Sequence, residues 1–114
     1  MKYFERKEFA CHCGCGFDTV DYELVIVLEE LREHFGAPVT ISSGCRCYLK
    51  NNSVGGSKDS QHIYGRAADI KVKGTSPKDV ADYLEGKYAD QYGVGRYTTW
   101  THIDTRNKKA RWVG

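Results

Sequence analysis

Residues 60–69 read Ser60-Gln61-His62-Ile63-Tyr64-Gly65-Arg66-Ala67-Ala68-Asp69, and they contain a turn followed at once by the start of a strand. Gly65 supplies the turn, because glycine adopts backbone conformations that other residues avoid. From Ala67 to Val72 the residues alternate as in a strand, whose side chains point to opposite faces in turn. We therefore expect His62, ahead of the turn, and Asp69, within the strand, to converge near the end of that strand.

A second segment, Trp100-Thr101-His102-Ile103-Asp104, alternates in the same way and predicts a neighbouring strand. Residues two apart on a strand face the same side. Asp104 is therefore expected to project beside His102, with Trp100 flanking His102 from the other direction. The two segments together predict a group of polar side chains at one place on a sheet.

Three of these side chains, His62, Asp69 and His102, form a ligand set that suits zinc. Imidazole nitrogens and carboxylate oxygens both bind this metal, and three protein ligands leave a fourth position open for water. Zinc in such a site makes water a nucleophile at neutral pH. The sequence therefore predicts one catalytic zinc ion and a hydrolytic reaction.

The N-terminal half of the chain predicts a helix, a strand and a loop. The helix is expected from about Val20 to Phe35, where apolar residues recur at helical spacing. These apolar positions are Leu24, Val27, Leu28, Leu31 and Phe35. Gly36 ends the helix, and a short strand follows over Val39–Ser42. The Gly/Ser/Asn-rich run from Ser43 to Ser60 is predicted to be a long loop with little periodic structure.

The C-terminal half predicts a second helix and three short strands. Ser76 can cap the helix and Pro77 fits its first position, so we expect it to run to about Tyr88. The strands are predicted over residues 91–97 and 100–104, joined by a tight turn, and over residues 110–113. This order of elements indicates a single α+β domain over residues 1–114, with a mostly antiparallel sheet and helices packed on one side.

Length and charge exclude several classes of protein. The chain has 114 residues, enough for one compact core, and its formal net charge of +2 is too small to indicate nucleic-acid binding. The basic run Lys108-Lys109-Ala110-Arg111 is interpreted as a solvated tail or an edge strand. No apolar run approaches the roughly 18 residues of a membrane helix, and the start lacks the apolar region of a secretory signal. We therefore expect a soluble product made in the cytoplasm.

Five cysteines lie in two clusters, Cys11-His12-Cys13-Gly14-Cys15 and Cys45-Arg46-Cys47. Because the number is odd, complete pairing is impossible. Disulfides between the clusters, a small structural metal site that uses some of these thiolates and His12, and buried reduced thiols all remain open. In each case the clusters are expected to tie the N-terminal loop to the segment that contains Arg46.

The motif Ser60-x-His62-x-x-Gly65-Arg66-Ala67-Ala68-Asp69, followed by Trp100-x-His102-x-Asp104, resembles the zinc D-Ala-D-Ala metallopeptidases. Their superfamily also contains the lysostaphin-type peptidases and the hedgehog signalling domain. The segment 39–46 is similar to the Ser-Gly-x-Arg region of the family, and residues 9–15 are similar to its small phage-like and bacterial branch. The resemblance covers nearly the whole chain and implies a hedgehog or D-Ala-D-Ala peptidase-like fold.

Carried over to this chain, the resemblance implies that His62, Asp69 and His102 bind zinc and that Arg46 holds a substrate carboxylate or carbonyl oxygen. The usual substrates of the family are stem or cross-link peptides of bacterial peptidoglycan. Many members have a Glu or Asp three residues before the last zinc histidine as general base. This chain has Thr99 at that position, so the resemblance does not identify the base.

Two roles are open for Asp104. It can take a proton from the nucleophile as general base, or it can hydrogen-bond a zinc-ligating imidazole and fix its tautomer. Arg46 is predicted to stabilise or position substrate, because its fork of donors suits a carboxylate or an oxyanion. Ser60, Gln61 and Trp100 are predicted to contact substrate.

The sequence therefore predicts a zinc metallopeptidase that hydrolyses peptidoglycan peptides as a carboxypeptidase or an endopeptidase. The alternative, which Thr99 supports, is a zinc-binding module without peptidase activity that binds wall peptide or a protein partner. The expected partner is peptidoglycan peptide, with no nucleic acid and no membrane insertion, and the chain is expected to be a monomer. Action on the bacterial cell wall would follow synthesis in the cytoplasm, with a phage or prophage as one source.

Overall fold

A computed structural model describes residues 1–57 and 60–114 of the chain. Five strands form one sheet in the order β1-β2-β4-β3-β5. They are β1 (Val39–Ser43), β2 (Ala67–Val72), β3 (Gly93–Arg96), β4 (Thr101–Asp104) and β5 (Ala110–Val113). All neighbouring pairs are antiparallel except β3 and β5, which are parallel. The predicted sheet is confirmed as mostly antiparallel, with one parallel edge.

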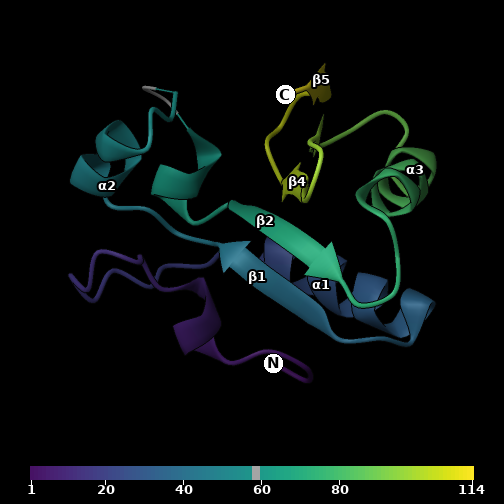
Figure 1. The fold of residues 1–114 in the computed structure, drawn as a ribbon, viewed down its shortest axis with the longest axis horizontal. Coiled ribbons are helices and arrows are strands. Elements are labelled where there is room, and N and C mark those ends of the chain that lie inside the picture. The colour runs from purple at the N-terminus through teal and green to yellow at the C-terminus, as the bar shows by residue number, and fades with distance from the viewer. Residues whose placement is uncertain (58–59) are drawn as a thin grey trace.

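Three helices and two short 3-10 turns accompany the sheet (Figure 1). They are η1 (Arg6–Phe9), α1 (Tyr22–Phe35), α2 (Tyr48–Ser53), η2 (Gln61–Tyr64) and α3 (Pro77–Lys87). Gly36 ends α1 in the left-handed conformation with a φ of 59°, as its position in the sequence predicts. Ser76 caps α3, since its hydroxyl accepts a hydrogen bond of 3.1 Å from the Asp79 backbone N–H.

One face of the sheet packs against α1 and α3 to form the core. On β2, Ala68 and Ile70 belong to this core, whereas Asp69 between them points to the opposite face. The strand pairing sets Ala68 opposite Ile103 and Asp69 opposite His102. The core also contains Leu24, Val27, Leu28 and Leu31 of α1 and Val80, Ala81 and Leu84 of α3. The α+β class and the helices on one side are confirmed, and the polar residues of β2 and β4 share the other face.

The prediction of a long loop from Ser43 to Ser60 is wrong in one respect, because Tyr48–Ser53 forms the helix α2. The helix is held by contacts rather than by an apolar repeat. The Sγ atom of Cys47 accepts a hydrogen bond from the Lys50 N–H, and the Asn51 side chain, which is fully buried, donates to the Ser57 carbonyl at 2.7 Å. Residues 58 and 59 of the predicted loop lie outside the described residues.

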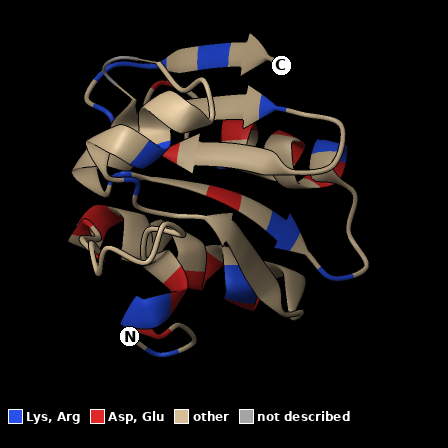
Figure 2. Ribbon diagram, turned by 60° about the vertical axis from the view of Figure 1, so that its left-hand side comes forward, with Lys and Arg blue, Asp and Glu red and all other residues tan. Residues whose placement is uncertain are grey.

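The charged residues are distributed over the whole ribbon. Figure 2 shows basic and acidic positions interspersed along the strands and helices. Arg96 of β3 forms ion pairs with Asp82 and Glu85 of α3, at 2.7 Å each, and these fasten the sheet to the helix. Within the described part of the chain, no helix combines the length and the apolar character needed to cross a bilayer.

Candidate metal centre

A cavity of about 540 Å³ lies on the sheet face that α1 and α3 leave uncovered. It brings together seven of the residues that the sequence singles out as site candidates. These are Arg46, Ser60, Gln61, His62, Asp69, Trp100 and His102. Asp104 is fully buried and contacts two residues that line the cavity, His102 and Arg106.

Three ligand atoms, one each from His62, Asp69 and His102, lie within 4.8 Å of one another in this cavity. The Asp69 carboxylate stands between the two rings, 3.4 Å from His62 Nε2 and 2.9 Å from His102 Nδ1. Zinc with bonds of 2.0–2.1 Å in a tetrahedral arrangement separates its ligand atoms by about 3.3 Å. The donor types and their spacing therefore fit zinc.

In each histidine, the ring nitrogen that faces away from Asp69 lies within hydrogen-bonding distance of an acceptor oxygen. His62 Nδ1 lies 2.6 Å from the Gly44 carbonyl, and His102 Nε2 lies 2.7 Å from Asp104 Oδ2. Both acceptors are oxygens without a proton to donate, so a ring nitrogen that bonds to one of them carries a proton. With the proton there, His62 would present Nε2 and His102 would present Nδ1 to a bound metal, which is the tautomer pattern that metal ligation requires.

Asp104 has both carboxylate oxygens engaged. Arg106 donates from Nε to Oδ1 and from Nη2 to Oδ2, at 2.7 Å each, while His102 occupies Oδ2 as well. Burial alone would raise the pKa of Asp104, but the hydrogen bonds from His102 and Arg106 lower it well below its usual range. This carboxylate is a fixed anion that orients His102.

Arg46 is held at the edge of the cavity by three side chains. Its guanidinium donates to Ser43 Oγ at 3.2 Å, to Asn51 Oδ1 at 3.4 Å and to Asp69 Oδ2 at 3.3 Å. Burial tends to raise the pKa of Asp69, but hydrogen bonds from His102 and then His62 lower it well below its usual range. The result is an anionic carboxylate that lies against the Arg46 guanidinium.

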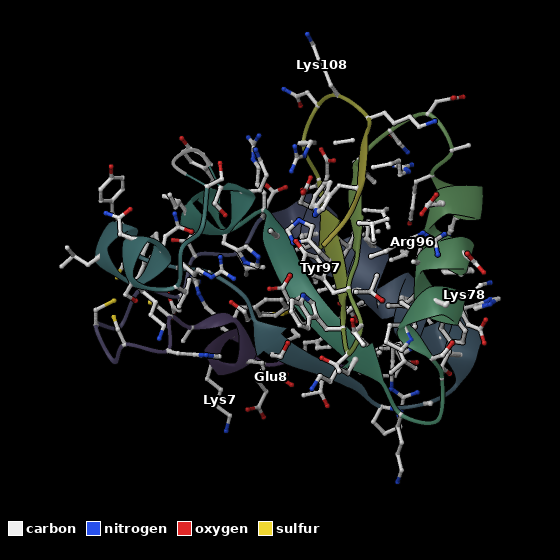
Figure 3. All side chains as sticks on the ribbon, turned by 45° about the horizontal axis from the view of Figure 1, so that its top comes forward. Lys7, Glu8, Lys78, Arg96, Tyr97 and Lys108 are labelled. Atoms are coloured by element: carbon white, nitrogen blue, oxygen red, sulfur yellow. The ribbon has the colours of Figure 1, made fainter. Side chains whose placement is uncertain are left out.

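An aromatic wall forms one side of the cavity, and Figure 3 labels one of its members, Tyr97. The rings of Tyr97 and Trp100 stack with centroids 4.4 Å apart, and Trp112 Nε1 donates to the Tyr97 hydroxyl at 2.9 Å. The Trp112 ring also lies 4.9 Å from the His102 ring. Trp100 Nε1 is buried without a hydrogen-bond partner among the described residues.

Ser60 and Gln61 begin the turn that presents His62. Ser60 Oγ accepts a hydrogen bond from the His62 N–H at 3.2 Å, and the Gln61 carbonyl accepts one from the Arg66 N–H at 3.1 Å. Gly65 closes the turn in the left-handed conformation with a φ of 68°. A Cβ atom there would lie 2.5 Å from the Thr19 carbonyl oxygen, so the position excludes side chains.

Sequence reasoning missed three residues of this site. Asn51 lies in a stretch with no apolar repeat, so no pattern pointed to its burial against Arg46. The contact between Arg106 and Asp104 could have been predicted, because side chains two residues apart on an extended chain lie close together. Trp112 sits in the predicted last strand, but its side chain reaches His102 only through the parallel pairing of β5 with β3.

Gly93 leaves room for the Asp104 carboxylate. The two residues are paired across β3 and β4, and a Cβ atom at position 93 would lie 2.5 Å from both carboxylate oxygens. We expect Gly93→Ala to lower the free energy of unfolding by about 1–3 kcal/mol, because a buried ion pair must move. Gly86→Ala is the matched control, since Gly86 lies in α3 with nothing within 4 Å and alanine there should be neutral or stabilising. Urea unfolding measures both, and equal effects would contradict the prediction.

Two comparisons with known proteins bear on this site. A family model described as Peptidase M15 matches residues 2–104. A curated relative, the zinc D-Ala-D-Ala carboxypeptidase of Streptomyces albus G, is 41% identical over 44 residues. That stretch is 38% of this chain and 17% of the carboxypeptidase, so the match covers a small part of that relative. Both comparisons point to peptidases, and the second names a zinc enzyme.

Proposed function

The chain belongs to the peptidase M15 family, and we propose that it is a zinc peptidase that hydrolyses peptide bonds in peptidoglycan stem peptides or cross-links. The observation that supports this most is the convergence of two histidines and one aspartate in an open cavity. The cavity is large enough for a short peptide and presents both a cationic side chain and an aromatic wall.

In this proposal His62 Nε2, Asp69 and His102 Nδ1 hold one zinc ion. When bound, zinc supplies Lewis acidity, which makes water a nucleophile at neutral pH and polarises a carbonyl. The protein fixes the three donors before the metal arrives, because the Gly44 carbonyl and Asp104 set the two ring tautomers. Preset ligands reduce the ordering that metal binding would otherwise require.

Asp104 is proposed as a positioning residue, and Asp104→Asn tests this. The amide removes the charge that holds His102, so we expect the zinc affinity of the cavity to fall about 10- to 100-fold while the cavity still binds its ion at saturation. Competition with a chromophoric chelator measures the affinity, and Asp90→Asn, at an exposed position, is the control. Unchanged affinity with a large fall in kcat would instead identify Asp104 as the general base.

The indole of Trp100 is proposed to donate a hydrogen bond to a carbonyl of the substrate. Trp100→Phe keeps a ring to stack on Tyr97 but removes the unpartnered N–H. We expect kcat/KM to fall about 2- to 10-fold, the value of one hydrogen bond, with zinc affinity unchanged. Steady-state kinetics on a soluble stem peptide measures this, and identical kinetics for both proteins would remove Trp100 from the substrate site.

The experiment that tests the function is mass spectrometry of fragments released from purified peptidoglycan by the zinc-loaded protein. Parallel reactions contain a chelator or the His102→Ala variant. We expect peptide fragments only from the untreated wild-type protein, and their masses identify the bond and separate carboxypeptidase from endopeptidase action. The same digest on walls of different cross-link chemistry identifies the bacterial cell wall on which the protein acts.

A non-catalytic zinc module is the second candidate, and one observation favours it. Among the described residues that line the cavity, Asp69 is the only carboxylate, and it is one of the proposed ligands. No fragment release from several wall types, with zinc still bound and wall peptide retained by the protein, would establish this second candidate instead.

A further inference from the structure

We propose that Cys11, Cys13, Cys15 and Cys47 form a second metal site, which binds one structural zinc ion through four thiolates. Their sulfur atoms lie within 4.8 Å of one another, although Cys47 is 32 positions or more from the other three in the sequence. In Figure 3 yellow sulfur atoms gather where the N-terminal loop meets α2. This site is separate from the catalytic cavity and does not depend on peptidase activity.

The distances between the sulfur atoms fit tetrahedral coordination of one metal ion. Cys13 Sγ lies 3.5 Å from Cys11 Sγ and also 3.5 Å from Cys47 Sγ. A tetrahedral zinc ion with Zn–S bonds of about 2.3 Å separates its sulfur ligands by about 3.8 Å. In a disulfide, a sulfur atom is bonded to one other sulfur atom only. Cys13 Sγ instead has two sulfur neighbours at the same distance, which is the arrangement expected when all three bind one central ion.

Backbone N–H groups point at two of the sulfurs. The Cys47 N–H donates to Cys11 Sγ and the Lys50 N–H donates to Cys47 Sγ, at 3.4 Å each. Such donors stabilise the negative charge of thiolates, which is the form that binds metal. The Cys11 N–H also closes the N-terminal loop by donating to the Phe17 carbonyl at 2.7 Å. This hydrogen bond closes residues 11–17 into a short loop, which contains three of the four cysteines.

The other residues of the two cysteine clusters fall outside this site. Cys45 is 2% exposed, is packed in the interior and does not join the group of four. His12 is exposed and does not join the group of four. Cys13 and Cys15 are both exposed, so an ion can reach the site from solvent. Four sulfurs with no histidine form a ligand set typical of closed structural zinc sites.

The structural consequence concerns Arg46, which directly precedes Cys47. Its N–H donates to the His62 carbonyl at 2.9 Å, so the backbone of this segment is joined to the turn that presents His62. The Cys45 N–H donates to the Phe9 carbonyl at 2.8 Å, which joins the same segment to the N-terminal chain. A metal at the four-cysteine site therefore fixes the N-terminal loop against the segment that positions Arg46.

The metal content of reduced, full-length protein tests the site. We expect two zinc ions per wild-type chain and one ion in each of Cys13→Ser, Cys15→Ser and His102→Ala, measured by inductively coupled plasma mass spectrometry. Both cysteine variants change exposed side chains and leave the core intact. His12→Ala and Cys45→Ala are controls from the same clusters and should retain two ions.

Cobalt loading gives a second readout. The wild-type protein and His102→Ala should both show intense sulfur-to-cobalt charge-transfer absorption in the near ultraviolet, whereas Cys13→Ser should lose most of it. The proposal is overturned if the wild-type protein and Cys13→Ser bind the same number of ions. It is also overturned if native mass spectrometry of aerobically prepared protein finds a disulfide among these four residues that persists when zinc is supplied. If the two cysteine variants each lose one ion but His102→Ala keeps two, the proposed catalytic site is contradicted and the four-cysteine site stands.

Discussion

Asp69→Ala is expected to remove zinc from the catalytic cavity and to lower kcat/KM by about 10³-fold or more. Asp69 is the central member of the site, since its two oxygens contact His62, His102 and Arg46. The Lewis acidity of a bound metal contributes several kcal/mol to catalysis, and each 1.36 kcal/mol corresponds to a tenfold change in rate. Zinc content and kinetics on a soluble stem peptide, measured on the same preparation, check this result.

Asp90→Ala is the matched control for that experiment, because Asp90 is exposed. Asp69→Asn separates charge from shape, since the amide keeps the size of the side chain. Thermal unfolding of each variant in chelator shows whether the metal-free fold persists. A folded Asp69→Ala protein that keeps both zinc in the cavity and full activity would refute the assignment of the metal site.

Arg46→Lys is expected to lower kcat/KM by about 10²- to 10³-fold, although it preserves the positive charge. Removal of one preorganised donor to a developing oxyanion has effects of this size. Lysine has no planar fork, so it cannot contact Ser43, Asn51 and a substrate oxygen together as the guanidinium can. Steady-state kinetics with a zinc assay on the same protein tests the prediction, and Arg66→Lys is the exposed control.

The division of the Arg46 effect between KM and kcat also distinguishes two modes of action. If Arg46 binds the free carboxylate at the end of a peptide, KM rises and substrates with an amidated end bind equally well to both proteins. If Arg46 stabilises charge on the scissile carbonyl, kcat falls and the end group of the substrate does not matter. Wild-type kinetics in Arg46→Lys, with zinc bound, would show that Arg46 only supports the structure.

The sequence predicted the sheet, both long helices and their caps because these elements follow local rules. The alternation from Ala67 to Val72 indicated β2, and Ser76 and Pro77 indicated the start of α3. The same alternation predicted that Asp104 and His102 share a face, and the two side chains lie 2.7 Å apart. Local pattern and final structure agree wherever the burial of one face determines the element.

What the sequence did not predict depends on contacts between distant segments. The helix α2 forms because Cys47 caps it and Asn51 is buried against Ser57, and neither contact appears as a repeat in the sequence. The place of Trp112 beside His102 depends on the parallel pairing of β5 with β3, which hydrophobic alternation does not specify. Tertiary context determines such residues.

The two glycines of β3 have a consequence for protein engineering. Gly93 makes room for the Asp104 carboxylate, and a Cβ atom at Gly95 would lie 2.6 Å from the Trp112 ring. Every residue larger than glycine at either position would displace a group that contacts His102. A library designed to change which peptides the cavity accepts should therefore keep both glycines and vary Val54 and Ser57, which also line the cavity.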